Sequence, residues 1–163
     1  MIKRVLVLSA LSVLTFVACS SENISSSPKE NDKITCDVIV DTDSALVFKI
    51  VIPDSGSVLH DFSLTKNKFL WKTIAEFEKD IPQSLLDQVC INSNAEAEEL
   101  REELKDRSID AIVTTECKEN IVERTITVES LFRQNPMPRL AAPMVYDCDE
   151  IQRTGKFPDE DEE

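Results

Sequence analysis

The period of the apolar residues changes twice along this chain, and that change limits the folds it can adopt. Between residues 34 and 78, apolar and polar side chains alternate, as they do in strands that bury one face. Between residues 82 and 104, apolar residues recur at spacings of three and four, which indicates an amphipathic helix. The alternation returns between residues 109 and 129. This order predicts an α+β domain, with an antiparallel sheet of about six strands and helical structure packed on one face.

Turn residues divide the alternating regions into four strands before the helical region and two after it. The expected strands are residues 34–40, 45–52, 58–64, 69–78, 109–117 and 121–129. The inward face of the first strand is expected to carry Ile34, Cys36, Val38 and Val40. In the fourth strand, Trp71 is expected in the core, because it alternates with charged residues that face water.

The helical region is compatible with one long helix or with two short ones. Pro82 suits the first turn of a helix, where its missing N–H is no loss. Ser93 and Glu96 have the spacing of a capping box, so the second alternative places a helix start near Asn92. The expected apolar stripe consists of Leu86, Val89, Cys90, Ser93, Ala97, Leu100 and Leu104.

The first 20 residues have the organisation of an export signal. Two basic residues precede an uncharged, mostly apolar stretch at residues 5–18, which is shorter than the about 20 residues that a membrane-spanning helix needs. This segment, with Ala18 directly before Cys19, resembles the lipobox of bacterial lipoproteins, although Phe16 stands where that family usually has Leu. In that family the Cys thiol receives a diacylglyceryl group, and the signal is cut off before the Cys. The resemblance implies that residues 1–18 are a signal peptide and that Cys19 carries the lipid.

The same resemblance implies a location, and composition completes the domain order. The lipid on Cys19 would anchor the chain to a membrane of the cell envelope, and Ser20 fits sorting to the outer membrane, with the periplasmic and surface faces both left open. Residues 19–33 are Ser-rich and polar, so we expect the lipidated Cys to be followed by a flexible tether. A single α+β domain is expected at residues 34–155, and an acidic, disordered tail at residues 156–163.

Lipidation of Cys19 leaves four cysteines, and an even number in an exported protein indicates two disulfides. Cys90 on the helix and Cys117 on the fifth strand are both expected to face the core, so we predict that they pair. Cys36 and Cys148 then form the second disulfide, which joins the first strand to the carboxyl-terminal segment. A metal site is the weaker interpretation, because the chain has one His and no two of these cysteines are close in sequence.

The charge and glycine content exclude several classes of function. The formal net charge is −13, and loss of the two basic residues of the signal leaves 16 basic against 31 acidic residues. Nucleic-acid binding depends on neutralising phosphates with Lys and Arg, so this balance argues against it. With two glycines in the whole chain, a Gly-rich phosphate loop and a dinucleotide fingerprint are both excluded, and we predict no cofactor.

Three positions were considered as sites and are each expected to be structural. His60 lies on the apolar face of the third strand, so we expect a packed imidazole rather than a catalytic one. Asp41 and Asp43 match the first ligands of a calcium loop, but the Gly and the closing Glu of that loop are missing. We therefore expect a hairpin turn at residues 41–44.

These observations favour a non-enzymatic module of the cell envelope that binds a partner or has a structural role. Its expected partners are the membrane, through Cys19, and an envelope protein of unknown identity. Two alternatives stay open. One is a hydrolase that acts on envelope or extracellular polymers, and the other is an accessory for assembly of outer-membrane proteins.

Overall fold

The computed structural model describes residues 33–65, 68–129 and 147–157, and these ranges form an α+β domain. Four strands follow one another: β1 (Thr35–Asp41), β2 (Ala45–Ile52), β3 (Gly56–Thr65) and β4 (Lys68–Phe77). A long helix, α2 (Gln83–Asp106), leads to β5 (Ala111–Lys118) and β6 (Ile121–Glu129). A short helix at residues 147–154 ends the described chain. The predicted fold class, with six antiparallel strands, one long helix and two disulfides, is confirmed.

The signal peptide at residues 1–18, Cys19 and nearly all of the predicted tether lie outside the described residues. Residues 158–163 of the predicted acidic tail also lie outside them.

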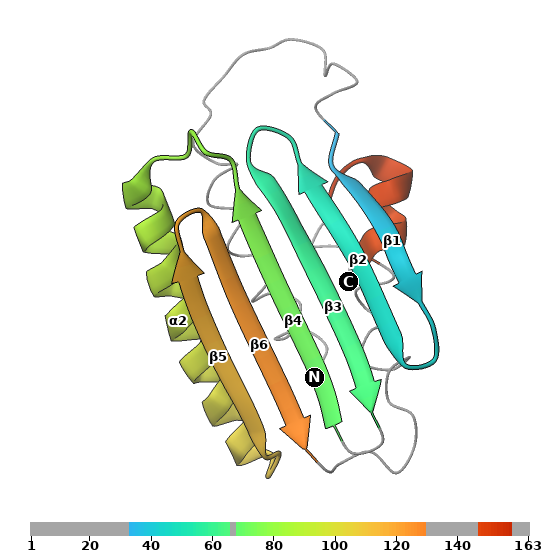
Figure 1. Ribbon diagram of the computed structural model, residues 1–163, viewed down its shortest axis with the longest axis vertical. Helices are drawn as coiled ribbons and strands as arrows, with labels where there is room; N and C mark the ends of the chain where they lie inside the picture. Colours follow the sequence, from blue (N-terminus) through green and yellow to red (C-terminus); the bar gives the residue numbers. More distant parts are fainter. Residues whose placement is uncertain (1–32, 66–67, 130–146, 158–163) are drawn as a thin grey trace.

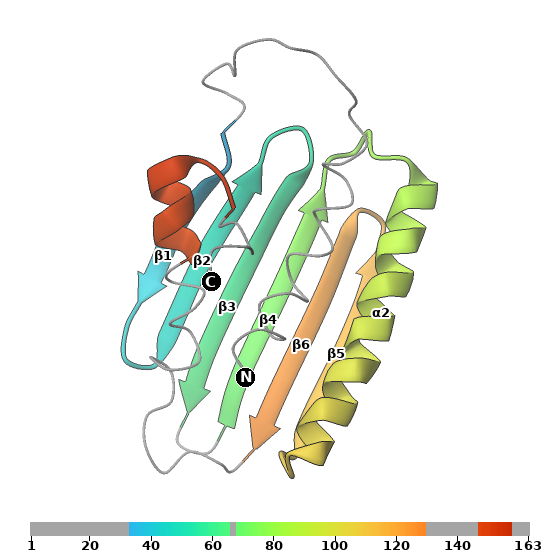
Figure 2. The ribbon, with the colours of Figure 1, turned by 180° about the vertical axis from the view of Figure 1, so that it is seen from behind.

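The six strands form one antiparallel sheet in the order β1-β2-β3-β4-β6-β5. After β4 the chain passes through α2, returns along the edge as β5, and then fills the gap between β4 and β5 as β6. Both helices lie on the same face of the sheet: α2 runs along and behind the edge strand β5 in Figure 1, and residues 147–154 lie behind β1 and β2. The reverse view shows the two helices in front of opposite sides of the sheet, with the middle strands between them (Figure 2).

The core lies on the face of the sheet that carries the helices. Alternating residues of β2, β3 and β4 point there, and aromatic rings form its centre. Phe48, Phe62 and Trp71 are all buried, and the Phe62 and Trp71 rings are stacked with centroids 5.1 Å apart. From the helix, the apolar side chains of Leu86, Val89, Ala97 and Leu100 are buried against the sheet. The prediction that Trp71 belongs to the core is therefore confirmed, and so is the α2 stripe except at Cys90 and Leu104, which are only partly buried.

Gly56 begins β3 because no other residue fits there. Its φ is +136°, a value that side chains with a Cβ rarely adopt, and a Cβ built on it would lie 2.0 Å from the carbonyl oxygen of Glu76 on the neighbouring strand. The glycine thus allows β3 to pair with β4 from its first residue, two residues before the predicted start of the strand.

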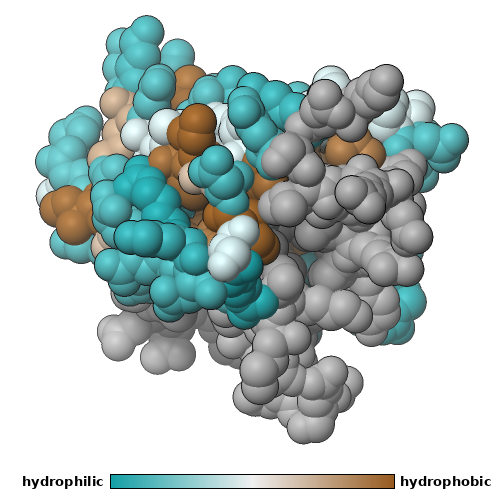
Figure 3. All heavy atoms as spheres, turned by 90° about the horizontal axis from the view of Figure 1, so that it is seen from below, coloured by the Kyte–Doolittle hydropathy of each residue, from teal (hydrophilic) through white to brown (hydrophobic). Residues whose placement is uncertain are grey.

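The opposite face of the sheet is covered by neither helix and mixes apolar and charged residues. Leu59 and Ile74 pair across β3 and β4, and beside them the Lys72 ammonium forms a salt bridge of 2.8 Å with the Glu123 carboxylate. The view from below, onto the lower ends of the strands, also shows apolar and polar residues side by side on the described part of the surface (Figure 3). The face has the alternation typical of an antiparallel sheet with one wet side.

The predicted inner face of β1 is confirmed as far as Val38 but is wrong for Val40. Val38 pairs with the inward residue Phe48, although its side chain is 42% exposed because β1 is an edge strand. The register shifts after Val38, so Val40 pairs with Val47 and lies on the opposite face. The extra residue at this bulge, Ile39, is also exposed. A bulge on an edge strand interrupts the ladder and makes the edge a poorer template for another strand.

The long-helix alternative is the observed one, because α2 runs without a break for 24 residues. Ser93 and Glu96 do not cap a second helix. Ser93 instead faces the sheet and is buried, and both residues accept hydrogen bonds from Arg124 on β6. Pro82 occupies the cap position directly before the first helical residue.

Each edge strand is fastened to a helix in the same two ways. On β1, a disulfide joins Cys36 to Cys148, and the Gln152 amide donates a hydrogen bond of 2.8 Å to the Cys36 carbonyl. On β5, the second disulfide joins Cys117 to Cys90 of α2. There the Arg101 guanidinium donates to the Val113 carbonyl through Nε at 2.9 Å and Nη2 at 2.6 Å.

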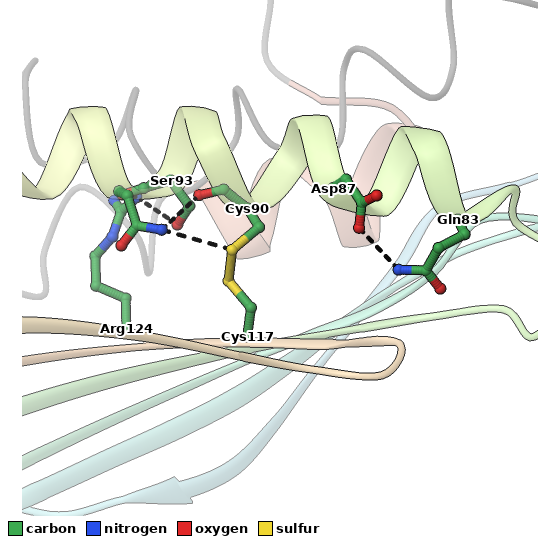
Figure 4. Close-up of a disulfide and its surroundings, with 7 residues drawn as sticks. Gln83, Asp87, Cys90, Ser93, Cys117 and Arg124 are labelled. Atoms are coloured by element: carbon green, nitrogen blue, oxygen red, sulfur yellow. Dashed lines mark hydrogen bonds between the residues drawn. A yellow bond between two sulfur atoms is a disulfide. The ribbon is translucent and has the colours of Figure 1, made fainter.

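Both predicted cysteine pairings are thus confirmed, and Cys117 lies on the inner face as predicted, opposite the buried Val122, but the Cys90–Cys117 disulfide is not buried in the core. The disulfide bridges the helix and the sheet at their rim (Figure 4). Cys117 is exposed and Cys90 is half-buried, because β5 is an edge strand with no neighbour on its outer side. Cys36 and Cys148, in contrast, are 2% and 0% exposed.

Candidate functional site

A row of polar side chains crosses the inner face of the sheet, and it contains the groups with the most reactive chemistry in the core. His60 on β3 pairs with Thr73 on β4, Thr73 with Arg124 on β6, and Arg124 with Thr115 on β5. His60 and Arg124 are both buried. Buried polar groups must find hydrogen-bond partners within the protein, so the partners of these two residues determine what they can do.

His60 is held by aromatic and hydroxyl neighbours. The Trp71 indole N–H donates to its Nδ1 at 3.4 Å, the Thr73 hydroxyl lies 3.3 Å from the same atom, and the Phe48 ring stacks on the imidazole with centroids 4.8 Å apart. Because Nδ1 accepts the indole proton, the neutral ring carries its own proton on Nε2. Burial lowers the pKa of His60 from 6.5 to about 3, since the surroundings disfavour the charged form. The prediction that His60 is packed is confirmed.

Arg124 joins the sheet to the middle of α2. Its Nη2 donates to the Ser93 carbonyl at 3.1 Å, to the Ser93 hydroxyl at 2.9 Å and to the Glu96 carboxylate at 2.8 Å. Figure 4 shows the guanidinium reaching up from the sheet to the helix beside the disulfide. A charged group takes this position because the carboxylate and the helix oxygens replace its water shell.

Arg124 was not among the residues of β6 expected to face the core, yet it lies at an inward position. The sequence does contain a sign of this orientation. Arg124 lies two residues after Val122 and two before Ile126, and in an alternating strand all three side chains point to the same face. A cation at an inward position indicates that an anion faces it, and Glu96 on the helix is that anion.

The turn at residues 41–44 closes on Thr42. Its hydroxyl oxygen accepts hydrogen bonds from the backbone N–H of Ala45 at 3.0 Å and of Ser44 at 3.4 Å, and its hydroxyl donates to the Ala45 carbonyl. The predicted hairpin turn is confirmed. In the ranges that the structure describes, no group of three His, Cys, Asp or Glu side chains is placed to hold a metal ion.

Asp147 begins the short helix beside the buried disulfide. Half-burial of its carboxyl raises its pKa from 3.8 to about 6, because the partly dry surroundings disfavour the anion. The adjacent Cys148 fixes this helix to β1.

The Cys90–Cys117 bond, called the rim disulfide from here on, is the disulfide of the described chain that is accessible to solvent. The side-chain amide of the exposed residue Asn94 donates to Cys90 Sγ at 3.5 Å and to the Cys90 carbonyl at 2.9 Å. The dashed lines of Figure 4 mark these contacts, one turn along the helix from the sulfur. An N–H that points at a sulfur favours the thiolate form of that sulfur over the thiol.

No family model matches this chain, and neither a curated protein nor a solved structure matches it. Within the described residues, no helix combines the length and apolar character needed to cross a membrane.

Proposed function

We propose that this protein is a lipid-anchored module of the bacterial cell envelope, attached through Cys19, which acts by binding or by a structural role rather than by catalysis. The main support for the proposal is that a lipobox-like segment is followed, in the same chain, by a domain with two disulfides. Structural disulfides form and persist in oxidising compartments such as the periplasm and the cell surface. The export signal and the cross-linked domain therefore support the same location.

The positions of the chemically versatile side chains support a non-enzymatic role. His60 is neutral, buried and bonded through Nδ1, and the Arg124 guanidinium is bound to the helix. Both side chains hold the inner layer together in the state that the structure describes. Their partners account for their presence without a substrate.

The anchor is tested by the intact mass of the protein from the membrane fraction of a bacterial host. We expect a chain that starts at Cys19 and carries a diacylglyceryl group and one acyl chain. Cys19→Ala should remain unlipidated and leave the membrane fraction, whereas the neighbouring Ser20→Ala should keep the lipid. An unlipidated wild-type chain would refute the anchor.

The binding role is tested separately, by affinity purification from solubilised envelopes. The lipidated wild type should recover a defined partner. The lipidated variant Lys72→Glu, which is altered on the open face of the sheet, should recover a different amount of the same partner. Hydrolysis of glycan or peptide panels by the purified domain, lost in His60→Ala while that variant stays folded, would contradict the non-enzymatic role.

A further inference from the structure

The two disulfides of this domain close similar links between a helix and an edge strand, but solvent meets only one of them. Cys36 and Cys148 are 2% and 0% exposed, whereas Cys117 is exposed and Cys90 is half-buried. A thiolate must reach a sulfur atom to break a disulfide. A reductant can therefore reach the rim disulfide in the folded protein, but it reaches the buried one only after the helix at residues 147–154 has left β1.

The surroundings of the rim disulfide also indicate which of its two sulfurs leaves when the bond is broken. Asn94 donates a hydrogen bond to Cys90 Sγ, and Cys90 is the less exposed of the two residues. Exchange is faster when the departing sulfur is stabilised as a thiolate, and an N–H donor supplies that stabilisation. Attack is therefore expected at Cys117 Sγ, with Cys90 as the leaving thiolate.

The contact between α2 and the sheet does not depend on this disulfide alone. Leu86 and Leu100 are buried on both sides of Cys90 along the helix. The Arg101 guanidinium donates a hydrogen bond to the Val113 carbonyl, and the Arg124 guanidinium donates one to the Ser93 hydroxyl. With these contacts in place, opening the disulfide gives a folded dithiol form rather than an unfolded chain.

We infer that Cys90–Cys117 is a thiol–disulfide exchange site of the folded protein, and that its reaction partner is a dithiol. One thiolate of the partner attacks Cys117 Sγ, a mixed disulfide forms, and Cys90 leaves with the electron pair of the broken S–S bond. The second thiol of the partner then attacks the mixed disulfide and releases Cys117. The partner becomes a disulfide, and its two protons pass to Cys90 and Cys117. This site is independent of the lipid on Cys19.

The charge of the chain restricts the partner further. With a formal net charge of −13, the protein repels anionic thiols at low ionic strength. A neutral dithiol, or one whose reactive thiolate lies among cationic groups, is the better match. Added salt should reduce the preference for a neutral over an anionic thiol, because it screens the repulsion.

The experiment reduces the full-length folded protein with dithiothreitol, a neutral dithiol, without denaturant. Free thiols, including Cys19 where it is unmodified, are first blocked with N-ethylmaleimide, and the newly released thiols are then labelled with the deuterated reagent and mapped by peptide mass. We expect Cys90 and Cys117 to be labelled at least ~10-fold faster than Cys36 and Cys148, whose release requires local unfolding. Equal labelling of all four, or no labelling until denaturant is added, would overturn the proposal.

The role of Asn94 is tested by its own variants. Asn94→Ala should slow the release of Cys90 and Cys117 about threefold, as expected for loss of a partly solvated hydrogen bond to an anion. Asn94→Asp should slow it further, because it places a negative charge beside the leaving thiolate. The matched control is Asn92→Ala on the same helix, whose side chain bonds Gln88 instead, and its rate should equal that of the wild type.

The melting temperature of each variant separates a change in exchange from a change in folding. Since Ala has a high helix propensity, Asn94→Ala should not lower the melting temperature. An unchanged reduction rate in Asn94→Ala would refute the assignment of Asn94 as the group that stabilises the thiolate. Loss of the far-UV helix signal on reduction, with Cys36–Cys148 still intact, would refute the folded dithiol form.

Discussion

Burial has opposite consequences for His60 and Arg124, although both lie in the same polar row. The imidazole can lose its charge, and its pKa falls to about 3. The guanidinium keeps its charge and must therefore be neutralised by a partner, which Glu96 supplies at 2.8 Å. The two residues thus make different contributions to stability, one dependent on pH and the other on an intact pair.

The contribution of His60 should disappear as the pH falls. Above the unfolded pKa of 6.5 both states are neutral, and the native state is not disfavoured. Between pH 6.5 and about 3 the unfolded chain binds a proton that the folded chain excludes, so unfolding becomes more favourable by about 1.4 kcal/mol per pH unit. We predict that His60→Gln, which keeps an acceptor for Trp71 and Thr73, loses stability less steeply over this range. Urea unfolding between pH 4 and 8 measures the two slopes, and parallel curves would contradict the prediction.

Removal of Arg124 should lower the free energy of unfolding far more than removal of Lys72, whose salt bridge is more exposed. Arg124→Met leaves the partly buried Glu96 carboxylate without its cation, and we predict a loss of about 3 kcal/mol in the free energy of unfolding. The matched control is Lys72→Met, whose salt bridge with Glu123 is about one-third exposed on the open face and should be worth about 0–1 kcal/mol. Urea denaturation compares the two, and similar losses would show that Arg124 does not need its pair.

At the scale of elements, the sequence predicts most of the strands and the helix because hydrophobic period is a local property. The alternation located β2 to β6 closely, and the three-and-four spacing located α2. Local signals failed where a distant element decides the outcome. The capping spacing of Ser93 and Glu96 indicated a helix start, but both residues serve Arg124, which lies 31 and 28 positions further along the chain.

Edge positions were the second failure, for a related reason. Alternation correctly placed Val38 and Cys117 on the inner face, but both are exposed there, since β1 and β5 have a neighbour on one side only. It also missed the bulge that moves Val40 to the other face. The strand order itself, with β6 between β4 and β5, results from packing across the whole sheet and has no local signature. The cysteine pairing was nevertheless predictable, since it needed only the elements on which each Cys lies.

The two disulfides should differ in their effect on stability. In the chain-entropy model, a link across 112 residues stabilises by about 5 kcal/mol and one across 27 residues by about 3.5 kcal/mol. Cys36 and Cys148 are also packed in the core, so their truncation leaves a cavity. We predict that Cys36→Ala/Cys148→Ala lowers the melting temperature more than Cys90→Ala/Cys117→Ala. Calorimetry of both double variants checks the order, and a reversed order would contradict it.

At the scale of the whole molecule, a single open sheet has two edge strands, β1 and β5, each without a neighbouring strand on its outer side. The helices are fastened to β1 and β5 through a disulfide and a side chain that bonds a strand carbonyl. Unpaired strand edges are templates for aggregation, and each of these side chains occupies one carbonyl of an edge strand. The same arrangement leaves the second face of the sheet, with its mixture of apolar and charged residues, uncovered by either helix.

Charge repulsion should set the salt dependence of the whole domain. With 31 acidic and 18 basic residues, the compact state concentrates negative charge that the unfolded chain spreads out. The screening length falls from about 30 Å at 0.01 M to about 10 Å at 0.1 M salt, so salt relieves this repulsion. We predict that raising sodium chloride from 10 to 200 mM at pH 7.5 increases the melting temperature by about 3 °C, which corresponds to a gain below 1 kcal/mol for a domain of this size. Sorbitol at equal osmolality is the control for effects other than screening. A fall in melting temperature with salt would mean that exposed pairs such as Lys72–Glu123 outweigh the repulsion between the remaining carboxylates.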